Sequence, residues 1–214
     1  MAQAIGGKGE TAVIAEFKRA SPSRGAIRED IGPEEAASIF ARAGATAISV
    51  LTEERFFQGE TDFLHRMEDA RLPLLRKDFI VDALQVRATA ATPASAVLVI
   101  AAVFRETPGE MASICRYARD LGLEPVVEVI REEELEAARG AGAEIIQVNN
   151  RDLVTLRVDR EASRRLIRER DARELWISAS GISSAEDVAE VRDLGFDACL
   201  VGTSIMEHND PAGF

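Results

Sequence analysis

The chain has 214 residues, 46% hydrophobic and 29% charged, which is typical of a globular protein that buries a large core. Its 26 basic and 37 acidic residues give a formal net charge of −11, which argues against a nucleic-acid partner. The sequence contains neither a long apolar run nor a basic-then-apolar leader, so we expect no membrane partner and a cytoplasmic location.

Short apolar segments recur along the chain and predict eight strands, at 12–17, 46–51, 72–77, 96–102, 125–129, 144–149, 175–180 and 198–202. Segments 31–44, 109–122, 131–142 and 184–195 carry early acidic residues, apolar residues three and four apart, and a glycine near the end, as helices do. Alternating strands and helices indicate an α/β fold with a parallel sheet. Eight units in this length predict a single-domain (β/α)₈ TIM barrel over 1–214.

Both ends of the chain depart from a full set of strand–helix units. Residues 1–11, which include Gly6, Gly7 and Gly9, are expected to form a flexible tail. Few residues follow the last predicted strand, so the last helix should be short or missing. An open Rossmann-type or flavodoxin-like sheet is the alternative, but no G-x-G-x-x-G follows the first strand.

Catalytic groups of such a barrel lie where strands end and in the loops that follow. The polar residues at these ends are Glu16, Lys18, Lys77, Glu128, Asn149 and Arg151. Lysines are rare here, only Lys8, Lys18 and Lys77, and an amine can be tuned for proton transfer or nucleophilic attack in a way that a guanidinium cannot. We expect burial near another cation to lower the pKa of Lys77.

Two chemistries fit these positions. Lys77 and Glu128 could act as an acid–base pair on a phosphosugar, or Lys77 could form a Schiff base as in a class I aldolase. A purely structural alternative is a set of ion pairs, such as Lys18–Glu16, that closes the top of the barrel. No cluster of histidine, cysteine and aspartate has metal-ligand spacing, so we expect no metal.

Short turns after the last two strands predict a phosphate site. "SASGI" and "VGTS" place small residues before helix N-termini, where backbone N–H groups can bind an anion. The expected phosphate ligands are Ser180, Gly181, Gly202 and Thr203. Each loop alone could equally be an ordinary tight strand–helix turn. The presence of both loops, on the two strands that usually form the phosphate site of a barrel, favours phosphate binding.

Six motifs, in order along almost the whole chain, resemble the indole-3-glycerol phosphate synthase family. They are "IAEFKRASPSRG" (14–25), "AISVLTEERFFQG" (47–59), "LLRKDFIVD" (74–82), "EPVVEV" (124–129), "NNRDL" (149–153) and "SGISSAEDV…LVGTSIM" (180–206). The resemblance implies conversion of 1-(2-carboxyphenylamino)-1-deoxyribulose 5-phosphate, a phosphosugar–anthranilate compound, to indole-3-glycerol phosphate. CO₂ and water are lost, and no cofactor is required. We expect a monomer or weak dimer.

The resemblance also implies residue roles. Lys77 would be the general acid, Glu128 the proton-transfer partner in loss of water, and Lys18, supported by Glu16, would contact the substrate carboxylate or share the acid role. Substrate would be bound by Ser21, Phe57, Phe79, Leu98, Asn149 and Arg151, with the phenylalanines and Leu98 lining an aromatic pocket.

The chain departs from the family pattern at a few places. Ala179 stands where the family has a glutamate that contacts substrate, and "ATPASAVLV" replaces the usual turn before the fourth strand. Most of the family's N-terminal extension and last helix are not in the sequence. These departures motivate one alternative, a weakly active or non-catalytic phosphate-binding barrel, trimmed or engineered. Another is a different phosphosugar enzyme, an isomerase or lysine aldolase.

Overall fold

The computed structural model describes residues 1–7, 11–208 and 211. Eight parallel strands close into a barrel in the order β1-β10-β9-β8-β7-β6-β5-β4, so the last strand of the chain pairs with the first. The barrel strands are β1 (Ala12–Phe17), β4 (Ala47–Leu51), β5 (Leu74–Lys77), β6 (Ala96–Ile100), β7 (Glu124–Val129), β8 (Ile145–Asn149), β9 (Leu175–Ala179) and β10 (Ala198–Val201). Each predicted strand overlaps one of these, and the predicted (β/α)₈ barrel is confirmed.

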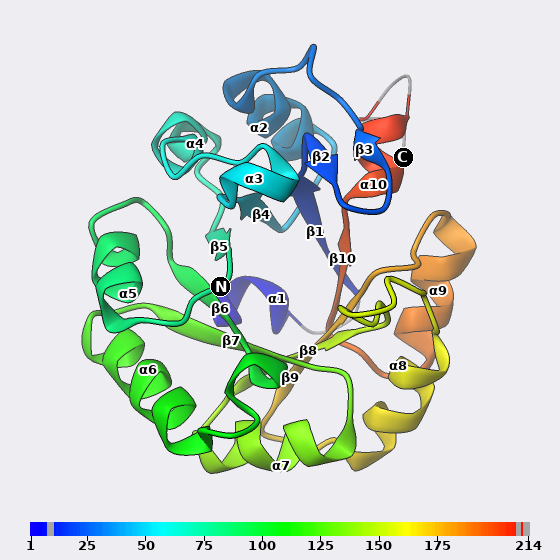
Figure 1. Cartoon of the computed structure of the whole chain (residues 1–214). Coiled ribbons are helices and arrows are strands. Elements are labelled where there is room, and N and C mark those ends of the chain that lie inside the picture. Colours follow the sequence, from blue (N-terminus) through cyan, green and yellow to red (C-terminus); the bar gives the residue numbers. More distant parts are fainter. Residues whose placement is uncertain (8–10, 209–210, 212–214) are drawn as a thin grey trace.

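Helices surround the barrel, as the view along its axis shows (Figure 1). They are α2 (Pro33–Arg42), α3 (Glu54–Phe57), α4 (Phe63–Arg66), α5 (Ala83–Ala90), α6 (Pro108–Asp120), α7 (Glu132–Gly140), α8 (Glu161–Leu166), α9 (Ala185–Asp193) and α10 (Thr203–Glu207), with 3₁₀ helices at Glu68–Ala70, Ala101–Phe104 and Ile167–Glu169. The four predicted helices correspond to α2, α6, α7 and α9. In the described part of the chain, no helix has both the length and the apolarity needed to cross a membrane.

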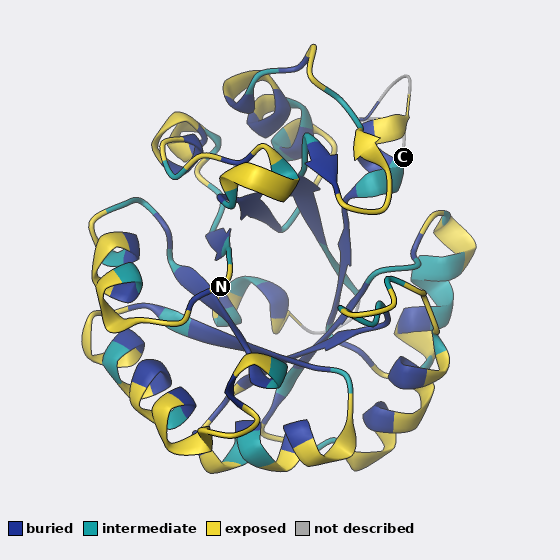
Figure 2. Cartoon of the chain, in the orientation of Figure 1, coloured by how far each residue is buried: buried dark blue, intermediate teal, exposed yellow. Residues whose placement is uncertain are grey.

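Two apolar layers stabilise this arrangement. Strand side chains that point outward, such as Val97 and Ile146, pack under the helices, while inward-pointing ones such as Leu98 and Ile145 fill the barrel. Figure 2 shows the result: buried strands, and outer helices that are buried toward the barrel and exposed toward solvent. Cys115 and Cys199 are free and buried. Apolar side chains therefore fill the interior of the barrel, and polar side chains gather at the carboxyl ends of the strands.

The expectation of a flexible tail over 1–11 is wrong for its first residues. Residues Ala2–Ile5 form a short helix, α1, which lies inside the ring of strands in Figure 1. Ile5 is fully buried in the interior apolar cluster, and the Ala2 N–H donates to Glu124 Oε1 at 3.1 Å. Apolar burial at the end of the barrel opposite the loops offsets the entropy of ordering this segment. Residues 8–10 lie outside the described part.

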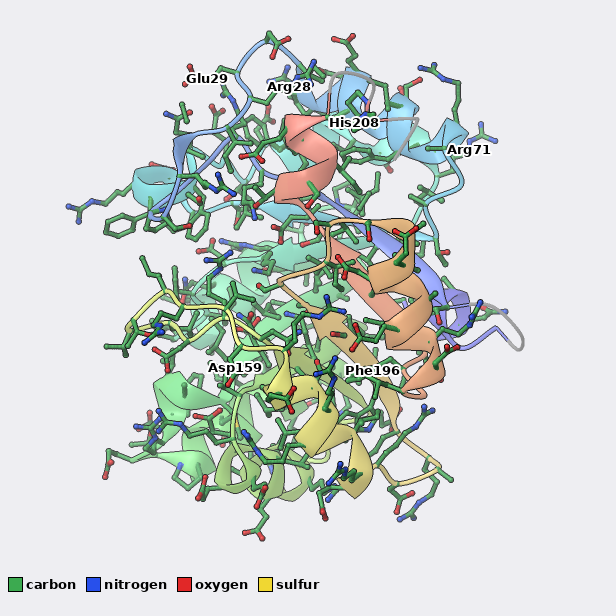
Figure 3. The ribbon with its side chains drawn as sticks, turned by 90° about the vertical axis from the view of Figure 1, so that its right-hand side faces the viewer. Arg28, Glu29, Arg71, Asp159, Phe196 and His208 are labelled. Carbon is green, nitrogen blue, oxygen red and sulfur yellow. The ribbon has the colours of Figure 1, made fainter. Side chains whose placement is uncertain are left out.

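The loop after the first strand is tied to the end of the last helix. After β1 the chain forms a small antiparallel pair, β2 (Ala20–Ser21) and β3 (Gly25–Ala26). Arg28 then donates to the carbonyl oxygens of Met206 and His208, at 3.3 and 2.6 Å, and Figure 3 shows Arg28 beside His208. The five-residue α10 is the short last helix that the sequence predicts. The β1 loop is thereby held over the edge of the barrel mouth.

Candidate active site

A cavity of about 790 Å³ lies at the carboxyl ends of the strands. Of the residues singled out from the sequence, it is lined by Glu16, Lys18, Ser21, Phe57, Lys77, Phe79, Asn149, Arg151, Ser180, Gly181, Gly202 and Thr203. Residues from six different strand ends and the loops that follow them therefore meet in one space, as the barrel topology requires. The two predicted site residues that do not line it are Glu128 and Leu98.

Glu16 bridges the two lysines of the site. Its Oε1 lies 2.9 Å from Lys18 Nζ and its Oε2 lies 3.5 Å from Lys77 Nζ, while Ser49 Oγ donates to Oε2 at 3.4 Å. Burial raises the pKa of the Glu16 carboxyl, but Lys18 and Lys77 outweigh burial and lower that pKa to about 2. Glu16 is thus an anion at neutral pH. The Lys18–Glu16 pair of the structural alternative exists, but it lies inside the cavity rather than sealing it.

Lys77 is more basic than an ordinary lysine. Burial alone would lower the pKa of its ammonium, but the charges of Glu16 and Glu128 outweigh burial, and the pKa is raised above its ordinary value of 10.5. The expectation of a lowered pKa was wrong, because the nearest charges across the barrel are carboxylates. Arg151, the cation that opposes this shift, has a smaller influence. Lys77 therefore carries its proton at neutral pH.

Glu128 lies just below the cavity on β7 and is 2% exposed. Asn149 Nδ2 donates to its Oε1 at 3.0 Å, and Gln147 Nε2 donates to its Oε2 at 2.6 Å. Gln147 was not singled out from the sequence. An isolated glutamine in an apolar strand carries little signal, although its spacing of two from Asn149 places both side chains on one face. The Asn149 Oδ1 accepts the Arg151 N–H at 3.0 Å, which extends this network to the loop after β8.

The loop after β8 folds over one side of the cavity. Arg151 Nη1 donates to the Leu156 carbonyl at 2.9 Å, and Arg151 pairs with Val158 in an isolated antiparallel bridge. Leu153, Val154 and Val158 from the same loop also line the cavity, and none of them was predicted from the sequence. Their apolar character gave no chemical signal. This loop brings both a cation and an apolar wall to the site.

The turns after β9 and β10 lie side by side, as the phosphate-site prediction requires. The Ser204 hydroxyl donates to the Ile182 carbonyl at 3.0 Å and joins the two loops. Ser180 and Gly181 both have left-handed backbone, with φ of 71° and 76°. A Cβ at Gly181 would lie 2.7 Å from Val158, and one at Gly202 would lie 2.5 Å from Glu16 Oε1. Both glycines are therefore required by close packing in addition to any role toward an anion.

The aromatic side of the cavity contains Phe57 and Phe79, with ring centroids 6.5 Å apart. Phe56 also lines the cavity and is 55% exposed. Leu98, by contrast, is 1% exposed among the interior apolar residues and does not reach the cavity. Its expected role in lining the aromatic pocket does not fit this geometry, because β6 points Leu98 into the packed layer below.

Two further positions complete the site. Ser21 lies in the loop after β1, where its Oγ is 3.4 Å from Ser23 Oγ, and the Arg24 side chain from the same loop also reaches the cavity. Ala179 ends β9 opposite Asn149 in the strand register and lines the cavity with its methyl group. Within the described residues, no three or more histidine, cysteine or acidic side chains are grouped so as to hold a metal ion.

Arg76, the neighbour of Lys77, points to the other side of β5. Its guanidinium donates to Thr52 Oγ1, Asp78 Oδ2 and Thr89 Oγ1 at 2.8–3.0 Å, beneath α5. Adjacent residues of a strand face opposite sides, so one basic residue supports the fold and the next one enters the site.

Comparison with known proteins identifies sequence relatives of this chain. A family model described as indole-3-glycerol phosphate synthase matches residues 2–214. Proteins named indole-3-glycerol phosphate synthase from Caldanaerobacter subterraneus subsp. tengcongensis and from Aquifex aeolicus are each 42% identical to this chain. The alignments cover 95% and 94% of this chain and 78% of each relative.

Solved structures of other enzymes share the fold. The 3-hexulose-6-phosphate synthase from Salmonella typhimurium has a TM-score of 0.74 at 18% identity and covers 95% of this chain and 94% of its own. The N-acetylmannosamine-6-phosphate 2-epimerase from Clostridium perfringens has a TM-score of 0.68 at 14% identity, with coverages of 90% and 86%. At these identities the similarity shows the barrel alone. The family match and the 42% identity over nearly the whole chain go further: the chain belongs to the indole-3-glycerol phosphate synthase family.

Proposed function

We propose that this protein converts 1-(2-carboxyphenylamino)-1-deoxyribulose 5-phosphate to indole-3-glycerol phosphate, CO₂ and water. The observation that carries the proposal is the position of Lys77, a protonated ammonium held in the cavity by Glu16. A proton donor is what ring closure onto a ketone needs, because the ketone oxygen becomes negative as the new bond forms. The remaining residues can be arranged around that step.

In the proposed first step, the ring carbon that bears the carboxylate bonds to the ketone carbon, and Lys77 gives its proton to the ketone oxygen. Loss of CO₂ restores the aromatic ring. Lys18, paired with Glu16, contacts the substrate carboxylate or shares the acid role. These roles for Lys18 and Lys77 are supported by their positions, with the two ammonium nitrogens 2.9 and 3.5 Å from the Glu16 carboxylate oxygens.

In the proposed second step, the new hydroxyl group takes up a proton and leaves as water as its C–O bond breaks. The neighbouring ring carbon loses a proton to form the double bond, and Glu128 serves in this proton transfer. Asn149 and Arg151 hold substrate hydroxyl groups, and Ser21 contacts substrate from the loop after β1. Phe57 and Phe79 contact the aromatic ring. The cavity supports these roles because both phenylalanines line it together with the polar residues of β1, β5 and β8.

The phosphate is proposed to bind at Ser180, Gly181, Gly202 and Thr203. Support comes from the joined turns after β9 and β10, where small residues leave the backbone accessible to the cavity. We also propose that the enzyme works in the cytoplasm. We further propose that it is a monomer or weak dimer, and sedimentation of the purified protein would test this oligomeric state.

Schiff-base chemistry at Lys77 is the less favoured alternative. It needs a neutral amine, and the raised pKa of Lys77 opposes loss of the proton. Borohydride trapping with substrate tests it directly, since a mass adduct on Lys77 would support a lysine aldolase mechanism. Ala179 supports a second alternative, weak activity, because a methyl group supplies no charge to the cavity.

The decisive experiment is the fluorescence assay for indole-3-glycerol phosphate formed from the open-chain substrate. We expect turnover above the no-enzyme background with the folded protein. Folded protein that binds inorganic phosphate but gives no turnover would contradict the proposal and would favour a non-catalytic barrel.

A further inference from the structure

The Glu128 carboxylate is held from one side by two amides of the neighbouring strand. Strand register places Glu128 opposite Gln147, and Asn149 follows two residues later on the same face of β8. Each carboxylate oxygen has its own donor: Gln147 Nε2 at 2.6 Å from Oε2, and Asn149 Nδ2 at 3.0 Å from Oε1. Two donors on two oxygens fix the plane of the carboxylate as well as its position.

The surroundings of Gln147 do not favour a glutamine for the stability of the fold. Gln147 is fully buried, and its Oε1 has no hydrogen-bond partner among the described residues. A buried acceptor without a partner destabilises the folded state. The surrounding interior residues are apolar, including Val126, Ile145 and Ile177. An apolar side chain of similar size would suit this layer better, so the amide at 147 needs another explanation.

The orientation of that amide is determined by its partner. Exchanging the nitrogen and oxygen of Gln147 would place two oxygens 2.6 Å apart, which a carboxylate does not tolerate. The donor end therefore belongs on Glu128, and the unpartnered oxygen is a consequence of that choice. Glu128 in turn acts on the site, because its charge helps to keep Lys77 protonated.

We infer that Gln147 is a positioning residue that orients the Glu128 carboxylate for proton transfer in the reaction. The inference rests on the proposed function, because the role of Glu128 is part of that proposal. Gln147 does not line the cavity and touches no substrate, so its effect passes through Glu128. Without it, Asn149 alone would hold the carboxylate, which could then rotate about the remaining hydrogen bond.

The test is Gln147→Met, which keeps the length of the side chain and removes the donor. We expect kcat to fall about 10- to 100-fold, as for a misplaced catalytic group, with KM within about twofold of the wild-type value. The second variant adds Gln147→Met to Glu128→Gln. There it should lower kcat by no more than about twofold, because a residue that acts through Glu128 loses its effect once that carboxylate is gone.

Ile145→Met is the matched control, since Ile145 is buried on the same face of β8, two residues earlier. It should leave kcat within about twofold, as expected for a volume-conserving change away from the site. Wild-type turnover with an unchanged kcat in Gln147→Met would overturn this inference alone. Equal losses from Gln147→Met with and without Glu128→Gln would overturn it as well. Absence of wild-type turnover would overturn the proposed function and this inference together.

Discussion

Lys77 and Arg76 show at the scale of single residues how one strand separates chemistry from support. Arg76 makes three side-chain hydrogen bonds beneath α5, whereas Lys77 contacts Glu16 inside the cavity. The distinction does not depend on charge, because both are cations. It depends on the ability of an amine to give up a proton, which a guanidinium does not do at accessible pH.

We predict that Lys77→Arg lowers kcat by about 10²- to 10⁴-fold, the usual contribution of a general acid or base. The positive charge is kept and the transferable proton is lost. Steady-state kinetics by indole fluorescence measures the effect. The reciprocal control is Arg76→Lys, which should lower the melting temperature but keep kcat within a few-fold. A near-normal kcat in Lys77→Arg would mean that Lys77 acts only through its charge.

Ala179 lines the cavity at the position where the resemblance leads us to expect a glutamate that contacts substrate. We predict that Ala179→Glu raises kcat/KM by about tenfold, equivalent to about 1.4 kcal/mol of transition-state stabilisation. The methyl group already points into the cavity beside the Asn149 strand end, so a longer side chain can reach the substrate. Ala179→Gln is the control that separates size from charge. An equal or lower kcat/KM in Ala179→Glu would show that the site is adapted to alanine.

At the scale of elements, α1 is a part of the fold that the sequence pattern did not predict. Four residues are too few for a helical period, and the glycines after them suggested a tail. The helix exists because Ile5 finds an apolar surface inside the barrel, and that surface forms only when strands distant in the sequence close on one another.

We predict that Ile5→Ala lowers the free energy of unfolding by about 2–5 kcal/mol, the usual loss for truncating a fully buried aliphatic side chain. Because α1 lies at the end of the barrel opposite the cavity, kcat should change little. Urea denaturation measures the stability and indole fluorescence the activity. Gln3→Ala on the exposed face of α1 is the control and should cost less than about 0.5 kcal/mol. Equal stability of the two variants would indicate that α1 does not pack in solution.

The strands and the residues at their ends could be predicted because each depends on a local pattern. Apolar runs gave the strands, and the barrel rule then selected Glu16, Lys18, Lys77 and Asn149. The pKa direction of Lys77 could not be predicted in the same way. It depends on Glu16 and Glu128, which follow from barrel closure rather than from spacing along the chain. For the same reason Gln147 was not predicted as a site residue, and Leu98 was predicted to line the cavity although it lies in the apolar interior.

At the scale of the whole molecule, a chain of net charge −11 gathers cations at one place. Lys18, Lys77, Arg24 and Arg151 line the cavity together with two carboxylates, Glu16 between the lysines and Glu207 at 3.9 Å from Arg24. A substrate that carries a carboxylate and a phosphate would meet a locally positive site on a negative protein, which favours its orientation at the mouth. The buried ion pairs between Glu16 and the two lysines should also contribute to the free energy of unfolding of the barrel.

This contribution gives a pH-dependent prediction. The pKa of Glu16 falls from its ordinary value of 4.5 to about 2 in the folded protein. A lowered carboxyl pKa adds stability above about pH 4.5 and loses it as the pH falls toward 2, because protonation then removes the ion pairs with both lysines. The full contribution is about 3 kcal/mol on the scale of 1.36 kcal/mol per pKa unit.

We therefore predict that wild type and Glu16→Gln differ most in free energy of unfolding above pH 5 and converge as the pH approaches 2. The other carboxyl groups titrate in both proteins and largely cancel in the difference, so the convergence reports on Glu16. Urea denaturation of both proteins at intervals between pH 2 and 7 measures it. A difference that stays constant over this range would show that Glu16 does not stabilise the fold through its charge. The two lysines would then have to be held in the site by contacts other than this carboxylate.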